Sequence, residues 1–109
     1  IEGGVVMGCG YALTEDYLEN PKNGMLASRS FTDYKLPTFQ DMPGELIVDI
    51  VEIPELEGPF GAKGIGEPTL LTTAPAIINA IYDAVGVQIK ELPATPEKIL
   101  AALKLQAVG

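Results

Sequence analysis

The sequence contains no histidine and only one cysteine, Cys9. Without histidine there is no Ser-His-Asp triad, no Cys-His pair and no imidazole ligand for a metal ion. A lone cysteine excludes an internal disulfide and a Cys-x-x-Cys metal site. We assign no metal ligand to this chain. Cys9 stands among apolar residues without a cationic neighbour, which predicts a buried, unreactive thiol. Any proton transfer therefore falls to carboxylates, lysines or tyrosines.

Positive charge is also scarce, because 7 lysines and arginines stand against 15 aspartates and glutamates, for a formal net charge of −8. A chain with this balance is not expected to bind nucleic acid or an anionic membrane, since both require a basic face. Glu2, Glu15 and Asp16 interrupt the N-terminal apolar stretch, so no run is long enough to cross a bilayer. With 109 residues, of which 47% are hydrophobic, the chain suffices for one small domain, and we expect a cytoplasmic location.

Three stretches have the pattern of helices. Residues 2–18 are apolar on nearly every side, and their glycines indicate close approach of either another helix or a ligand. Residues 76–85 repeat apolar residues at helical spacing before a stop at Gly86, with Pro75 predicting a kink or a fresh start near Ala74. Residues 94–104 predict a helix with Thr95 as N-cap, Pro96 at the first position, and a buried side formed by Ile99, Leu100 and Leu103.

Two further stretches are typical of strands. Residues 44–53, GELIVDIVEI, are rich in β-branched side chains, and both faces are mostly apolar, which predicts cover on both sides. Residues 87–92, VQIKEL, predict a shorter strand, and residues 20–24 predict a turn. The expected fold class is α+β, a small single domain in the order helix, loop, strand, glycine loop, helix, strand, helix.

The glycine loop is the most unusual stretch. Residues 58–68, GPFGAKGIGEP, contain four glycines ahead of Glu67. The phosphate-loop pattern fails because Lys63 is followed by glycine, and the dinucleotide pattern fails because residue 69 is threonine. The residues alone leave two interpretations of Glu67 open: a cap at the start of a helix, or a functional carboxylate beside a backbone that passes close to another group.

The loop and its surroundings resemble the molybdenum hydroxylases, the xanthine dehydrogenase and aldehyde oxidase family. GPFGAKGIGEP is similar to the C-terminal signature of that family. The resemblance continues, in the same order, through the glycine-rich helix, the connector and the closing elements, at residues 1–15, 31–43, 73–86 and 91–103. It implies that residues 1–109 are the C-terminal part of a molybdopterin-binding domain, within the large, molybdenum-binding subunit of a longer protein.

The resemblance also implies a reaction and a site. Enzymes of this family hydroxylate an electron-poor carbon of a heteroaromatic ring or an aldehyde with oxygen from water. Glu67 matches the general base of the family, and Gly64, Ile65 and Gly66 match the segment that lies against the molybdenum cofactor. Molybdopterin is expected in the complete enzyme, iron–sulfur clusters and FAD in partner domains or subunits, and no cofactor in the isolated segment. Met7 departs from relatives that have glutamine at this position.

Two other functions are weighed against this one. A non-catalytic docking domain could share the same frame, with Glu67 serving only as a helix cap. An anion-binding module built on the glycine loop is disfavoured by the negative charge of the chain and by Glu67 itself. In either enzymatic or docking form, the segment should pack against an upstream molybdopterin-binding region. Alone, it should expose apolar surface around Val5, Val6 and Leu13 and self-associate.

Overall fold

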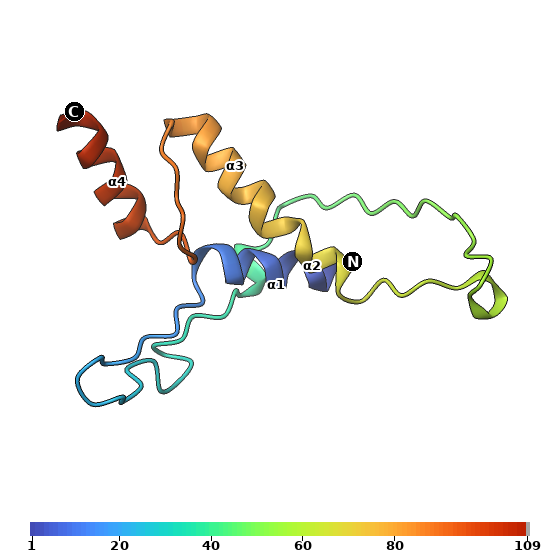
Figure 1. Ribbon diagram of the computed structural model, residues 1–109, viewed down its shortest axis with the longest axis horizontal. Helices are drawn as coiled ribbons and strands as arrows, with labels where there is room; N and C mark the ends of the chain where they lie inside the picture. Colours follow the sequence, from blue (N-terminus) through green and yellow to red (C-terminus); the bar gives the residue numbers. More distant parts are fainter. Residues whose placement is uncertain (109) are drawn as a thin grey trace.

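The computed structural model describes residues 1–108, which are mostly helical and irregular. Figure 1 shows a central group of helices from which one loop and one long arm extend in different directions. The elements are α1 (Glu2–Leu13), η1 (Phe39–Asp41), η2 (Pro59–Gly61), α2 (Pro68–Leu71), α3 (Thr73–Val85) and α4 (Pro96–Val108), where η denotes a single 3-10 turn.

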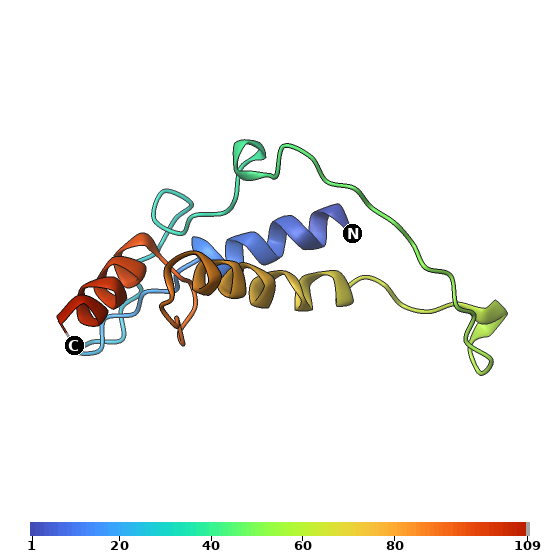
Figure 2. The same cartoon turned by 90° about the horizontal axis from the view of Figure 1, so that it is seen from above.

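Helix α1 packs against α2 and the beginning of α3, and Figure 2 shows these helices side by side. Two glycines of α1 permit the close approach. A Cβ atom at Gly4 would overlap Thr69 Oγ1 and lie 2.7 Å from Thr69 Cβ. A Cβ atom at Gly8 would overlap Thr73 Cβ and lie 2.8 Å from Thr73 Cγ2. Of the two neighbours expected for these glycines, the structure therefore places a helix, not a ligand, beside Gly4 and Gly8.

The ends of the helices follow their local sequence signals. Pro75 lies in the first turn of α3, where its missing N–H has no helical partner in any case, and a break at Thr72 separates α2 from α3. Gly86 takes a left-handed conformation (φ 72°) and donates its N–H to the Tyr82 carbonyl at 2.7 Å. Thr95 Oγ1 accepts the Lys98 N–H at 3.4 Å, as expected for the N-cap of α4.

The first predicted helix is shorter than expected. It ends at Leu13 rather than near residue 18, because the N–H groups of both Thr14 and Glu15 turn back to the Gly10 carbonyl. Residues 20–24 form the predicted turn, which one isolated antiparallel bridge between Glu19 and Leu26 closes.

The predicted strands are not confirmed. Residues 44–53 are extended, but within residues 1–108 neither they nor residues 87–92 pair in a sheet. A strand needs the N–H and C=O groups of a neighbour. The two segments cannot supply each other, because they lie on different sides of the helices (Figure 1). The strands of the expected α+β class are therefore not confirmed, and the described residues form a mostly helical segment with one long extended stretch.

The hydrophobic core is small. Within the described part of the chain, the buried apolar side chains are those of Ala12, Ala74, Val87 and Ala94, and none of the large side chains is fully buried. The Ala94 N–H donates to the Ala12 carbonyl at 2.6 Å, which joins the segment before α4 to the end of α1. The radius of gyration is 17.7 Å, whereas a compact chain of this length has about 13 Å. These residues do not close a core by themselves.

The exposed apolar surface differs from the one predicted. Val5, Val6 and Leu13 are half-buried, and so is Cys9, whereas Leu100, expected in the core, is 52% exposed. Several of the most exposed apolar side chains lie on the extended stretch and its tip, where Val51 is 80% exposed and Leu56 is 94% exposed, and Phe39 in η1 is 88% exposed. In the described residues, no helix has the length and apolar character needed to cross a membrane.

Candidate functional site

The glycine loop lies on a long arm, residues 44–67, which leaves the helices and returns to the start of α2 (Figure 1). The tip of the arm is closed by a hydrogen bond of 3.1 Å from the Glu55 N–H to the Gly61 carbonyl. Phe60 at the tip has a positive φ of 55°, a conformation that side chains rarely adopt. Chain direction thus reverses at residues 55–61, and the residues after the tip run back toward α1.

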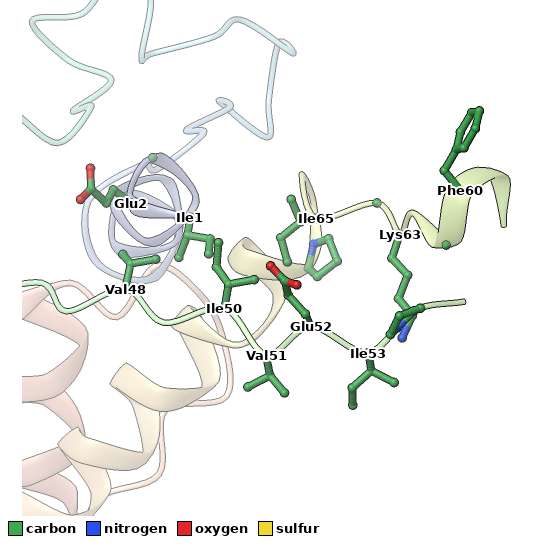
Figure 3. Close-up of a pocket in the computed structure, with 15 residues that line it drawn as sticks. Ile1, Glu2, Val48, Ile50, Val51, Glu52, Ile53, Phe60, Lys63 and Ile65 are labelled. Carbon is green, nitrogen blue, oxygen red and sulfur yellow. The ribbon is translucent and has the colours of Figure 1, made fainter. Parts of the chain in front are cut away.

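A cavity of about 920 Å³ lies between the two limbs of the arm and the beginning of α1. In Figure 3, Ile50 and Glu52 point from one limb toward Ile1 and Ile65, whereas Val51 and Ile53 point to the opposite side. This alternation is that of a β-strand with two apolar faces. The wall of the cavity is mostly apolar, and Lys63 contributes a cation from the returning limb.

The residues predicted to border a cofactor form an open backbone. A Cβ atom at Gly64 or at Gly66 would meet nothing within 4 Å among the described residues, and Ile65 is 59% exposed. These glycines therefore differ from Gly4 and Gly8, whose space is occupied by a helix. A flat, uncovered backbone of this kind can accept a large ligand without a clash from side chains, so residues 64–66 are compatible with the expected cofactor.

Glu67 stands at the junction between this open backbone and α2. It is the residue that precedes the helix (φ −80°, ψ −33°), and its carbonyl accepts the Leu70 N–H at 3.0 Å. Its side chain is exposed and makes no capping hydrogen bond within residues 1–108. A cap formed by a hydrogen bond is therefore absent, whereas a favourable interaction of the carboxylate with the dipole of α2 needs no such bond, and both interpretations of Glu67 stay open.

Thr69, two residues after Glu67, was not singled out from the sequence. Thr69 Oγ1 donates a hydrogen bond to the Gly66 carbonyl at 3.1 Å, and Thr73 Oγ1 donates to the Thr69 carbonyl, also at 3.1 Å. Both threonines are half-buried against α1, unlike Glu67 and Pro68. A threonine in the first turn of a helix is too common to mark a site, so no signal in the sequence distinguished Thr69.

Comparison with known proteins identifies the family. The sequence profile of the molybdopterin cofactor-binding domain matches residues 1–43. The chain is 44% identical over 104 residues to the aldehyde oxidoreductase of Megalodesulfovibrio gigas, a match that covers 95% of this chain and 11% of that protein. It is 40% identical over 99 residues to the xanthine dehydrogenase molybdenum-binding subunit of Escherichia coli O157:H7, covering 91% of this chain and 13% of that protein. The chain belongs to the molybdenum hydroxylase family.

Solved structures of molybdenum hydroxylases share the arrangement of this segment. Quinoline 2-oxidoreductase from Pseudomonas putida 86 superposes with a TM-score of 0.86 at 29% identity, over 95% of this chain and 13% of that chain. Aldehyde oxidoreductase from Desulfovibrio gigas superposes with a TM-score of 0.80 at 42% identity, over 94% and 11%. This molybdenum hydroxylase segment thus spans only about an eighth of the length of its relatives, and its extended arm is a feature of a much larger fold.

Proposed function

We propose that this chain is the C-terminal part of the molybdopterin-binding domain of a molybdenum hydroxylase. The complete enzyme would hydroxylate an electron-poor carbon of a heteroaromatic or aldehyde substrate with oxygen from water. The relatives named for aldehydes, xanthine and quinoline support this class of reaction. The observation that carries the proposal is the uncovered Gly64–Gly66 backbone that leads directly into an exposed carboxylate with no structural partner in residues 1–108.

The proposed catalytic residue is Glu67, acting as a general base. Its carboxylate oxygen would accept the proton released when oxygen from water is transferred to the substrate carbon. Because the side chain is neither capping α2 nor buried in the segment, it is free to face a substrate held by the rest of the subunit. Pro68, the first residue of α2, has a fixed φ and directly follows Glu67, which limits the directions in which Glu67 can point.

Gly64, Ile65 and Gly66 would border the molybdenum cofactor. When bound, the cofactor supplies the electron acceptor for the oxidation of the substrate. The contribution of this chain is to present a backbone without side-chain bulk at Gly64 and Gly66, so that Glu67 can lie close to the substrate. Lys63 is exposed, and its side chain is not needed for this role.

The arm would find its structural partner in the upstream molybdopterin-binding region of the same protein. Ile47 is 83% exposed and Val51 is 80% exposed, which is unfavourable for an isolated chain in water. The alternating directions of Ile50 and Val51 in Figure 3 fit a strand that is covered on both faces once a sheet forms. Iron–sulfur clusters and FAD would belong to partner domains or subunits, which would carry the electrons onward.

The test is Glu67→Gln in the complete enzyme with its bound cofactor. The amide keeps the shape of the side chain but cannot accept the proton, and loss of a general base typically costs about 10²–10⁴ in rate. The rate of single-turnover reduction by substrate should fall by that factor, with molybdenum content and melting temperature unchanged. Glu57→Gln, which removes another exposed carboxylate from the same arm, is the matched control and should reduce at the normal rate. A fully loaded Glu67→Gln enzyme with normal reduction would refute the general-base assignment.

The docking-domain alternative predicts a different result. If the segment only joins other chains, Glu67→Gln should leave reduction unchanged, while substitutions on the apolar arm such as Val51→Asp should disrupt assembly. Disruption by Val51→Asp is expected under either interpretation, because the catalytic proposal also has the arm covered by the upstream region. The reduction rate of Glu67→Gln is therefore the measurement that separates a catalytic role from a purely structural one.

A further inference from the structure

We propose that Thr69 is a positioning residue for Glu67 and that α1, through Gly4, holds Thr69 in place. The inference rests on the proposed function, because it requires Glu67 to be the base. Thr69 lies outside the glycine loop and would fix the backbone of Glu67. The glycine-rich α1 would in turn fix the position of Thr69.

The first step concerns the two peptide groups on either side of the Glu67 Cα atom. The carbonyl of Gly66 belongs to the preceding peptide group, and it accepts the Thr69 hydroxyl at 3.1 Å. The carbonyl of Glu67 belongs to the following one, and it accepts the Leu70 N–H at 3.0 Å. When both peptide planes are held, φ and ψ of Glu67 are held with them, and so is the direction of its Cα–Cβ bond.

The hydroxyl bond matters more here than at an ordinary helix start. Gly66 precedes Glu67, and a glycine allows the chain many conformations that other residues exclude. The space where a Cβ would lie at Gly64 and Gly66 is empty within the described chain, so no packing on that side restricts the backbone at these two positions. Among the hydrogen bonds of residues 1–108, the one from Thr69 is the contact that ties this free stretch to α2.

The second step concerns what keeps the Thr69 side chain itself in place. A threonine in a helix divides between two χ1 rotamers, because its hydroxyl can bond a carbonyl three or four residues earlier. The backbone of α1 at Gly4 lies directly against Thr69, so that an added Cβ would be 2.7 Å from Thr69 Cβ. Because Gly4 has no side chain, the backbone of α1 lies in van der Waals contact with Thr69. This contact restricts rotation of the Thr69 side chain about χ1.

Thr73 provides the comparison that separates positioning from helix stability. It packs against Gly8 in the same way and also donates its hydroxyl to a backbone carbonyl at 3.1 Å. Its acceptor is the Thr69 carbonyl in α2, whereas the acceptor of Thr69 lies in the glycine loop next to Glu67. The two threonines therefore share packing and chemistry and differ in what their hydroxyl groups hold.

The experiment compares Thr69→Val, Thr69→Ser and Thr73→Val in the complete, cofactor-loaded enzyme. Valine keeps the shape of threonine and removes the hydroxyl, whereas serine keeps the hydroxyl. Displacement of a reacting group by about 1 Å can cost on the order of 10²-fold in rate. Thr69→Val should therefore slow single-turnover reduction by about 10-fold or more, with unchanged substrate affinity. Thr69→Ser should largely restore the rate, and Thr73→Val should retain it.

A second measurement does not depend on activity. Amide hydrogen exchange in a peptide covering residues 64–72 should be faster in Thr69→Val than in Thr69→Ser, because the loop has lost its attachment to α2. Thr73→Val should leave exchange of residues 64–67 unchanged. If Thr69→Val lowers melting temperature or molybdenum content more than Thr73→Val does, Thr69 is a structural residue and the proposal is overturned.

A double-mutant cycle with Glu67→Gln distinguishes failure of this inference from failure of the proposed function. If Thr69 acts through Glu67, Thr69→Val should have no further effect on the rate in the Glu67→Gln enzyme. If Glu67→Gln is slow but Thr69→Val alone is normal, the positioning role is refuted and the base remains. If Glu67→Gln is normal, the proposed function fails first, and the positioning role fails with it.

Discussion

Replacement of Gly8 by alanine tests the close packing of α1 against α3. An alanine in a helix interior is favoured over glycine by about 0.5–1 kcal/mol. At Gly8, however, the new methyl group would overlap Thr73 Cβ and lie 2.8 Å from Thr73 Cγ2. Because a Cβ atom is fixed to its backbone, the helices must move apart, and such overpacking costs about 1–3 kcal/mol. The net effect should be a loss of up to about 2.5 kcal/mol.

Gly3→Ala is the matched control, because a Cβ atom at Gly3 meets nothing within 4 Å. It should leave α1 unchanged or stabilise it by up to about 1 kcal/mol. Where alanine gains the same helix propensity at both positions, the difference between the two variants is the cost of overpacking, about 1–3 kcal/mol, or roughly 5- to 150-fold in the opening equilibrium of the helix. Amide hydrogen exchange of peptides from α1, measured in the complete subunit, reports that equilibrium. If both variants exchange alike, α1 and α3 are not in close contact in the assembled enzyme.

Two further predictions concern the loop after α1 and the isolated chain. The Tyr34 hydroxyl donates to the Glu15 carboxylate at 2.7 Å, and this bond, with burial and the negative charge of Glu15, raises the pKa of Tyr34. The contribution of this bond to stability should be fully present below about pH 10 and be lost as pH rises through the raised pKa of Tyr34. Glu15→Gln should lower the pH at which Tyr34 ionises, measured by tyrosinate absorbance. An unchanged titration would contradict the bond. Residues 1–109 produced alone should self-associate through side chains such as Val51 and Leu56, which are 80% and 94% exposed. Sedimentation velocity over a dilution series measures this, and a monomer at every concentration would count against it.

The parts of the fold that were predictable depend on neighbours in the sequence. Gly86 ends α3 because its own backbone can take a left-handed conformation, and Thr95 begins α4 with its own hydroxyl. The strand over residues 44–53 depends on a partner that residues 1–108 do not provide. Its sequence indicates an extended chain with two apolar faces, which the structure has, but a sheet is a property of two segments and could not follow from one.

The candidate site, too, was predictable only where it depends on the local sequence. The spacing of Gly64, Gly66 and Glu67 is readable in the sequence, and resemblance to a family gave it a role. The glycines of α1 predicted a close neighbour, but only the structure identifies it as Thr69 and Thr73. Thr69 escaped prediction because its effect comes from a hydroxyl bond to Gly66 and from contact with a helix that lies 65 residues earlier in the chain.

The pairing of α1 with α2 and α3 also constrains how the protein is made. Residues 14–67 separate these elements, so α1 leaves the ribosome well before the helices that cover its glycine face. At the usual speed of synthesis, about 5–20 residues per second, the interval is about 3–11 s. During that time the part of α1 around Gly4 and Gly8 lacks the threonines that cover it in the folded chain. It must be sheltered by segments already synthesised or by a chaperone, and closing a loop of this length then costs about 4 kcal/mol of chain entropy.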